Sequence, residues 1–140
     1  MTDVRVFFLT KPTAEQLRAI VGLYRQAGWW PAGEEADYGL LARLVRQSHC
    51  FVVAMAGEEL IGMGRAISDG VSDAYVQDVT VDSRWRRAGL GSRIVRLILE
   101  RLRADGLNWV ALIAERGSAP FYGQFGFEEM EDARPMLLTP

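Results

Sequence analysis

The residues best suited to chemistry in this chain form a glycine-containing turn, Arg86 to Ser92, between an apolar alternating stretch and an amphipathic one. A strand should lead into this turn and a helix should begin in it, with the unpaired N–H groups and partial positive charge of a helix start. Gly89 and Gly91 carry no Cβ, so an anion can approach the main chain closely. Arg86 and Arg87 add charged donors that suit phosphate oxygens. The turn therefore predicts a phosphate-binding site.

Two common nucleotide-binding motifs are excluded. A Walker A loop requires Gly-x-x-x-x-Gly-Lys-Ser/Thr, but Lys11 is the only lysine of the chain. A dinucleotide-binding motif requires Gly-x-Gly-x-x-Gly, whereas this turn holds one Gly-x-Gly preceded by arginines. The ligand should therefore be held by another kind of phosphate turn.

The turn resembles the acetyl-CoA signature of the GCN5-related N-acetyltransferases (GNAT superfamily), Arg/Gln-x-x-Gly-x-Gly/Ala, which residues 86–91 match position by position. A second stretch, Pro120 to Phe127, is similar to a later Phe-Tyr-x-x-x-Gly-Phe element of that family. With the order of the predicted elements, the resemblance extends over nearly the whole chain. It implies an N-acetyltransferase that uses acetyl-CoA as cosubstrate.

Length and composition set limits on the other possibilities. The 140 residues, 49% apolar and 24% charged, are typical of one globular domain, which we assign to residues 1–140. A net charge of −2 predicts no general attraction to nucleic acid or to an anionic membrane. Cys50 is the single cysteine and His49 the single histidine, which argues against a zinc site and against a Cys-His catalytic site. We therefore expect no metal. No apolar run approaches ~18 residues and the N-terminus lacks signal-peptide features, so we expect a cytoplasmic protein.

Hydrophobic periodicity gives the order of the elements. It predicts a strand at 4–9, a helix at 14–27 with a capping box from Thr13 and Gln16, a helix at about 35–47, and a hairpin of strands 51–56 and 60–68. A strand at 75–81, a helix at 90–105, a strand at 109–114, a short helix at 118–124 and a closing hairpin within 128–138 should follow. This order resembles the family's fold. The expected class is α/β, a single-domain GNAT-like fold whose mixed, mostly antiparallel sheet has a parallel splayed pair in the middle and helices on both faces.

The resemblance also implies how the cofactor is held. Main-chain N–H groups from Arg87 to Ser92 would bind the CoA pyrophosphate, and the main chain at Val79 and Val81 would pair with the pantetheine amides. That pairing requires the strand at 109–114 to diverge from the strand at 75–81. The residues alone also fit two fully paired core strands and arginines that are merely solvated. The implied cofactor-binding residues are Val79, Thr80, Val81, Arg86, Arg87, Ala88, Gly89, Leu90, Gly91, Ser92 and Phe121.

Two residues are candidates for proton transfer. The family commonly has a tyrosine at the position of Tyr122, where it protonates the departing CoA thiolate; the alternative is an aromatic that only packs. Asp78, the only carboxylate of the strand at 75–81, is the candidate base for the attacking amine; the alternative is an aspartate that only hydrogen-bonds a neighbouring loop. Glu115 stands where many relatives have an asparagine that contacts pantetheine, so it is a second candidate for base or substrate contact. A water chain is the third.

The acceptor site should lie under the first two helices and their link. Their aromatic residues suit an amine on an apolar body, although a lid that packs on the sheet is an equal interpretation; they are Tyr24, Trp29, Trp30 and Tyr38. We expect direct acetyl transfer in a ternary complex to a small-molecule or peptide amine, without an acetylated Cys50. A non-catalytic CoA-binding sensor or assembly domain is the rival class. Dimers are frequent in the family, so a homodimer is the oligomer that the resemblance suggests.

Overall fold

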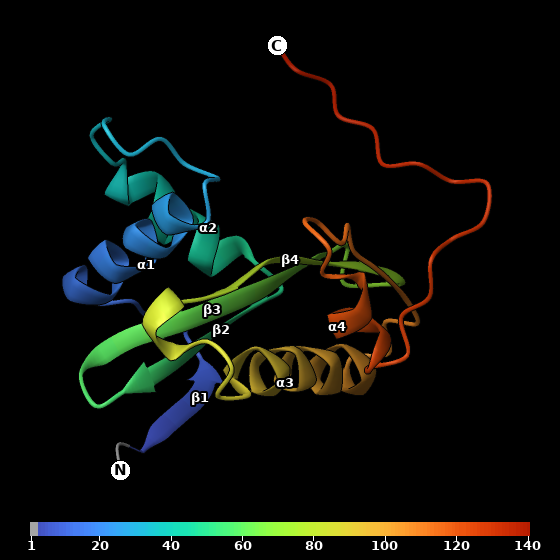
Figure 1. Cartoon of the computed structure of the whole chain (residues 1–140), viewed down its shortest axis with the longest axis horizontal. Helices are drawn as coiled ribbons and strands as arrows, with labels where there is room; N and C mark the ends of the chain where they lie inside the picture. The colour runs from blue at the N-terminus through green and yellow to red at the C-terminus, as the bar shows by residue number, and fades with distance from the viewer. Residues whose placement is uncertain (1–2) are drawn as a thin grey trace.

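The computed structural model of the protein describes residues 3–140 and contains a five-stranded sheet in the order β1-β2-β3-β4-β5 (Figure 1). Neighbouring strands from β1 to β4 are antiparallel, and β5 pairs with β4 in parallel. The strands are β1 (Val4–Phe8), β2 (Cys50–Ala56), β3 (Glu59–Ser68), β4 (Asp73–Val81) and β5 (Trp109–Ala111). This mixed α/β architecture confirms the predicted fold class.

Helices cover both faces of the sheet, as Figure 1 shows. On one face lie α1 (Ala14–Gln26) and α2 (Tyr38–Gln47), whose apolar side chains pack against alternate residues of β2 such as Phe51 and Val53. On the other face α3 (Leu90–Ala104) packs against Val52 and Ala54 of the same strand. Two short elements complete the chain, the 3-10 helix η1 (Ser83–Trp85) and α4 (Ala119–Gly123). Because β2 is buried on both faces, it reads in the sequence as a continuous apolar run.

The helix starts follow local hydrogen-bonding rules. The Thr13–Gln16 capping box at the start of α1 is confirmed, since each side chain accepts the other residue's backbone N–H, at 3.1 and 2.9 Å. Helix α2 begins at Tyr38 rather than near residue 35, because the Asp37 side chain caps it by accepting the Leu40 N–H at 2.9 Å.

Helix α3 approaches β3 unusually closely. A Cβ added at Gly64 would lie 2.8 Å from Cγ2 of Ile94 and 3.1 Å from Cγ2 of Val79. This glycine therefore sets the depth at which α3 sits on the sheet, and with it the position of the turn that begins the helix.

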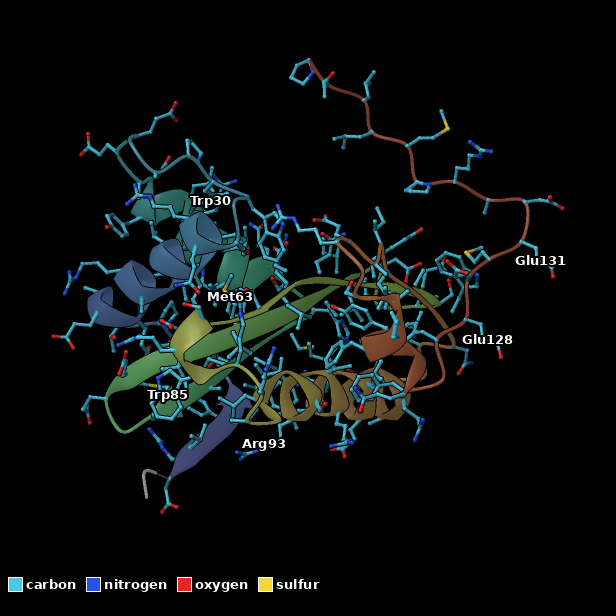
Figure 2. All side chains as sticks on the ribbon, viewed as in Figure 1. Trp30, Met63, Trp85, Arg93, Glu128 and Glu131 are labelled. Carbon is cyan, nitrogen blue, oxygen red and sulfur yellow. The ribbon has the colours of Figure 1, made fainter. Side chains whose placement is uncertain are left out.

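Two predictions at the C-terminal end differ from the structure. The expected strand at 109–114 ends at Ala111. The predicted closing hairpin within 128–138 is wrong, because these residues form no strand. The segment runs away from α4 in an extended conformation, and Figure 2 labels Glu128 and Glu131 on it. The side chains of residues 136–138 are 88–95% exposed. The parallel pair β4–β5 consequently lies at one end of the described sheet and not in its middle.

Among residues 3–140 no helix combines the length and the apolar character needed to cross a membrane.

Candidate active site

The glycine turn leads from β4 into α3, as predicted, and the 3-10 helix η1, which was not predicted, lies between β4 and the turn. Arg87 and Gly89 have positive φ angles of +68° and +76°, and Gly89, the N-cap of α3, has no side chain to satisfy the first N–H groups of the helix. A Cβ at Gly89 would meet no heavy atom within 4 Å, so open space lies over this residue. The turn thus offers unpaired donors and the positive end of the α3 dipole to an anion.

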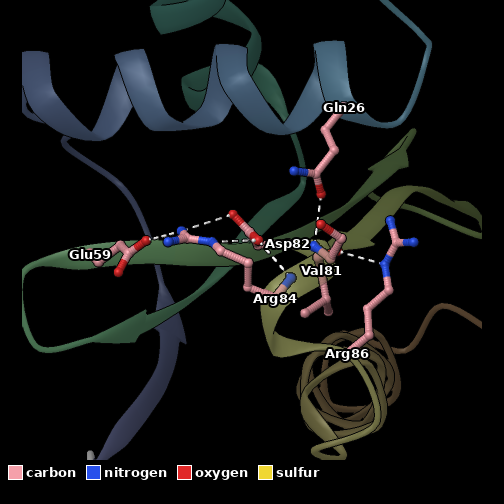
Figure 3. A network of polar contacts seen from close by, with 7 residues as sticks. Gln26, Glu59, Val81, Asp82, Arg84 and Arg86 are labelled. Atoms are coloured by element: carbon pink, nitrogen blue, oxygen red, sulfur yellow. Dashed lines mark hydrogen bonds and ion pairs between the residues drawn. The ribbon is translucent and has the colours of Figure 1, made fainter.

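The arginines around the turn have different roles (Figure 3). Arg84 forms ion pairs with Glu59 and with Asp82, the latter at 3.1 Å, and its hydrogen bonds lower the pKa of the Asp82 carboxyl. The Arg86 Nε donates a hydrogen bond to the Val81 carbonyl at 3.0 Å, so this arginine stabilises the end of β4. Arg87 is exposed beside the helix start. Sequence reasoning missed the bracing role of Arg84 and Arg86, since nothing in the pattern distinguishes a bracing arginine from a ligand.

Strands β4 and β5 diverge after a short paired segment. Their pairing ends at Tyr75 and Ala111, whereas β4 continues to Val81. The side chains of Val79 and Val81 pack against the core cluster under α3, and Thr80 is half-buried. This divergence leaves the outer main-chain edge of β4 without a β5 partner, as the resemblance to the family implied.

Tyr122 faces the space beside β5. It lines a hollow of about 730 Å³ together with Tyr75, residues 109–114 and the C-terminal segment. Its ring lies edge-on to Phe121 and Phe127, with centroids 4.9 and 6.0 Å away. Burial, followed by the negative charge of Glu115, raises the pKa of the Tyr122 hydroxyl. The group is therefore protonated at neutral pH and available as a donor.

Phe121 connects α4 to the glycine turn. A Cβ at Gly91 would lie 3.3 Å from Cζ of Phe121, so the ring packs directly on the first turn of α3. Phe121 thus lies next to the predicted phosphate site, and a side chain at position 91 would crowd this ring.

Asp78 occupies a bulge in β4. Its φ is +58°, and the register between β3 and β4 shifts between Met63 and Arg65. Its Oδ2 accepts hydrogen bonds from Arg65 Nε and from Tyr24 Oη, each at 2.7 Å. The carboxylate is therefore an ion-paired group that also anchors α1. No sequence pattern indicated the bulge or the Arg65 partner.

Three of the four predicted acceptor aromatics come together. Trp30 stacks on Tyr24 with centroids 4.2 Å apart and planes 7° apart, and Trp29 stands edge-on to Tyr24 at 6.1 Å. Both tryptophans also pack against the core cluster beneath α1, and Figure 2 shows Trp30 on that side of the sheet. Burial and then Asp78 raise the pKa of Tyr24, which is a structural donor. Tyr38 is 42% exposed at the first turn of α2, outside the stacked group.

The segment between β5 and α4 contacts the link between α1 and α2. Trp29 Nε1 donates to Glu115 Oε2 at 3.4 Å, and Arg116 Nη1 donates to the Ala27 carbonyl at 2.7 Å. Glu115 therefore borders both the aromatic group and Tyr122, whose pKa it raises.

Cys50 lies outside this arrangement. It is buried at the start of β2, and burial raises the pKa of its thiol to about 11. A protonated, buried thiol is a poor nucleophile.

The sheet ends in a parallel pair that diverges, and a turn suited to phosphate follows β4 at the start of α3. This arrangement agrees with the GNAT-like fold expected from the sequence. A family model described as the acetyltransferase (GNAT) family matches residues 14–127. The chain belongs to the GNAT acetyltransferase family.

Relatives and solved structures agree with this assignment. The chain is 33% identical over 100 residues to the histone acetyltransferase TAP1 of Glycine max, covering 69% of this chain and 42% of that protein. It is 35% identical over 84 residues to the chloroplastic GCN5-related N-acetyltransferase 2 of Arabidopsis thaliana, covering 59% of this chain and 33% of that protein. A probable acetyltransferase from meticillin-resistant Staphylococcus aureus has a TM-score of 0.82 at 25% identity over 99% of this chain and all of that one. The chain spans about a third to two fifths of the length of these two curated relatives.

Proposed function

We propose that the protein transfers an acetyl group from acetyl-CoA to a primary amine by direct attack within a ternary complex. The observation that carries this proposal is the unpaired outer edge of β4 after Tyr75, between the glycine turn and Tyr122. Such an edge can hydrogen-bond an amide-bearing chain as if it were a neighbouring strand. The amides of pantetheine suit it, and the open start of α3 suits the pyrophosphate.

Proton transfer is assigned to two side chains. Tyr122 acts as the acid for the departing thiolate, since its hydroxyl is protonated and lines the hollow beside β5. Asp78 acts as the base for the ammonium group through Oδ1, because both of its side-chain hydrogen bonds are accepted by Oδ2. The β4 backbone polarises the thioester carbonyl.

The rival function is a CoA-binding domain without catalysis. The position of Tyr122 favours the enzyme, because a sensor has no need of a protonated phenol beside the diverging strands. The similar structures include proteins named as glucosamine-6-phosphate and aminoglycoside acetyltransferases, each at 17% identity, so they support the fold and do not select an acceptor. The cytoplasmic location, the single domain and the homodimer stay predictions.

The direct test is a screen for acetyl-CoA consumption over a library of primary amines, read as release of free thiol. We expect amine-dependent thiol release for one class of amine and an acetylated product by mass spectrometry. Thermal stabilisation by CoA without release of thiol in the presence of any amine would favour the sensor.

A further inference from the structure

The C-terminal segment of the chain is extended but is not paired with any other part of it. Within residues 3–140, no hydrogen bond or ion pair involves residues 128–140. The chain turns at Asp132, where φ is +53°, and then continues without secondary structure to the C-terminus, which lies away from the sheet in Figure 1. The backbone N–H and C=O groups of this segment are therefore available to a neighbouring strand.

The sequence at the end of this segment is that of a buried strand. Met136, Leu137 and Leu138 are consecutive large apolar residues, and their side chains are 88–95% exposed. Such a continuous run, without alternation, is typical of a strand that is covered on both faces. Pro135 and Pro140 flank it, and proline is tolerated at the ends of a strand because it has no N–H to donate. Residues 136–139 thus have the composition of an inner strand and lack the neighbours of one.

Strand β5 offers the matching surface. It is the last strand of the described sheet and pairs only with β4, so its other edge is free. Residues 109–114 line the hollow of about 730 Å³, and residues 128–130 and 133–136 line it from the other side. Ile113 is 60% exposed there. An extended polypeptide that enters the hollow can pair with the free edge of β5 and cover these apolar side chains.

The segment that best fits this hollow comes from a second copy of the chain. In its own chain the segment forms a wall of the hollow at residues 133–136 and does not fill it. Fully extended, residues 133–140 reach about 26 Å at the rise of a β-strand, which is longer than residues 109–114 in the same conformation. A two-fold axis makes the contact reciprocal, because each copy supplies one segment and one hollow.

We propose that two copies of the chain form a dimer by exchanging residues 133–140, so that the segment of each copy pairs with the free edge of β5 in the other. Because Tyr122 lines the same hollow, the exchanged segment completes the wall beside this residue. The edge of β5 that faces β4 takes no part in the contact, so the position proposed for the cofactor is left open. This proposal does not depend on the proposed acetyl transfer.

The first test measures molar mass by light scattering over a range of protein concentrations. We expect the wild-type protein to have about twice the 15.6 kDa of one chain. Leu137→Asp and Leu138→Asp should each halve the mass, because a charge cannot be buried in the hollow without a partner. Both side chains are exposed in the single chain, so its own fold should be retained, which circular dichroism would verify. Leu40→Asp, at an exposed leucine of α2, is the matched control and should stay dimeric.

A wild-type protein that is monomeric at every concentration, or folded Leu137→Asp and Leu138→Asp proteins that remain dimers, would overturn the proposal.

Hydrogen exchange identifies which copy supplies the segment. The amides of residues 112–114 and 136–139 should be protected in the dimer and should lose this protection when dilution produces the monomer. Protection that persists in the monomer would mean that the segment folds back on its own β5. A dimer in which these amides exchange freely would mean that the copies meet elsewhere. Either result would contradict the exchange of segments.

Discussion

The Tyr122 hydroxyl borders the hollow beside β5, and its pKa is raised by burial and by Glu115. Replacing Tyr122 by Phe keeps the ring contacts with Phe121 and Phe127 and removes only the proton. Because a positioned acid contributes ~10²–10⁴-fold, kcat should fall within about that range. The affinity for CoA should hardly change, since the loss is felt in the transition state. Steady-state kinetics with CoA titration would check both quantities.

The sign of the Tyr122 pKa shift adds a condition to this prediction. A raised pKa keeps the acid protonated at and above its ordinary value of about 10, so the wild-type rate should not decline at alkaline pH until that value is passed. Equal kcat for Tyr122→Phe and the wild type, at a pH where chemistry limits the rate, would leave Tyr122 a packing residue.

The functional residues could be predicted from the sequence where they belong to a recognisable pattern. Tyr122, Gly89 and the aromatic group could be selected by pattern, and the structure brings Tyr24, Trp29 and Trp30 together. The partners of Asp78 could not, because Arg65 and Tyr24 come from distant parts of the chain and meet it only through a bulge. The alternation of apolar and polar residues in a strand does not reveal where one extra residue forms a bulge.

The start of α3 carries the predicted phosphate site, and a pair of matched substitutions can test it. Gly89 and Gly70 share a φ of +76° and lie in open space, but Gly70 belongs to the turn between β3 and β4. Valine at either position should impose a similar backbone strain. We expect Gly89→Val, and not Gly70→Val, to lose most of the thermal shift caused by CoA. A normal shift in folded Gly89→Val would contradict the assigned site.

The close approach of α3 to β3 depends on Gly64. Its replacement by Ala forces a contact of 2.8 Å with Ile94, and such overpacking typically costs about 1–3 kcal/mol of unfolding free energy. Gly22→Ala, on the exposed surface of α1, should instead stabilise by up to about 1 kcal/mol, because alanine is the better helix former. Urea unfolding would measure both. Equal stability of Gly64→Ala and the wild type would mean that α3 shifts without cost.

The elements with a strong hydrophobic period were predicted well, and those without one were not. Helices α1 and α3 end within one residue of the expected bounds. The segment 128–138 has apolar residues that suggested a hairpin, but in the structure they are exposed and unpaired with β5. Apolar content alone cannot distinguish a strand from an extended segment, because pairing depends on what lies beside it.

For the whole molecule, the sheet order and its coverage by helices could be expected, because motif order and resemblance both pointed to the GNAT family, which the match over residues 14–127 confirms. The hydrogen bonds between the α1–α2 link and the β5–α4 segment could not be expected. They depend on Arg116 and Glu115, which lie 89 and 86 residues along the chain from their partners.

The measurement that tests direct acetyl transfer most simply is the initial rate as a function of both acetyl-CoA and amine concentration. Attack within a ternary complex predicts double-reciprocal lines that intersect, in keeping with a buried Cys50 whose pKa is raised to about 11. Parallel lines, together with an acetylated form of the protein after incubation with acetyl-CoA alone, would contradict the proposal and require a covalent intermediate.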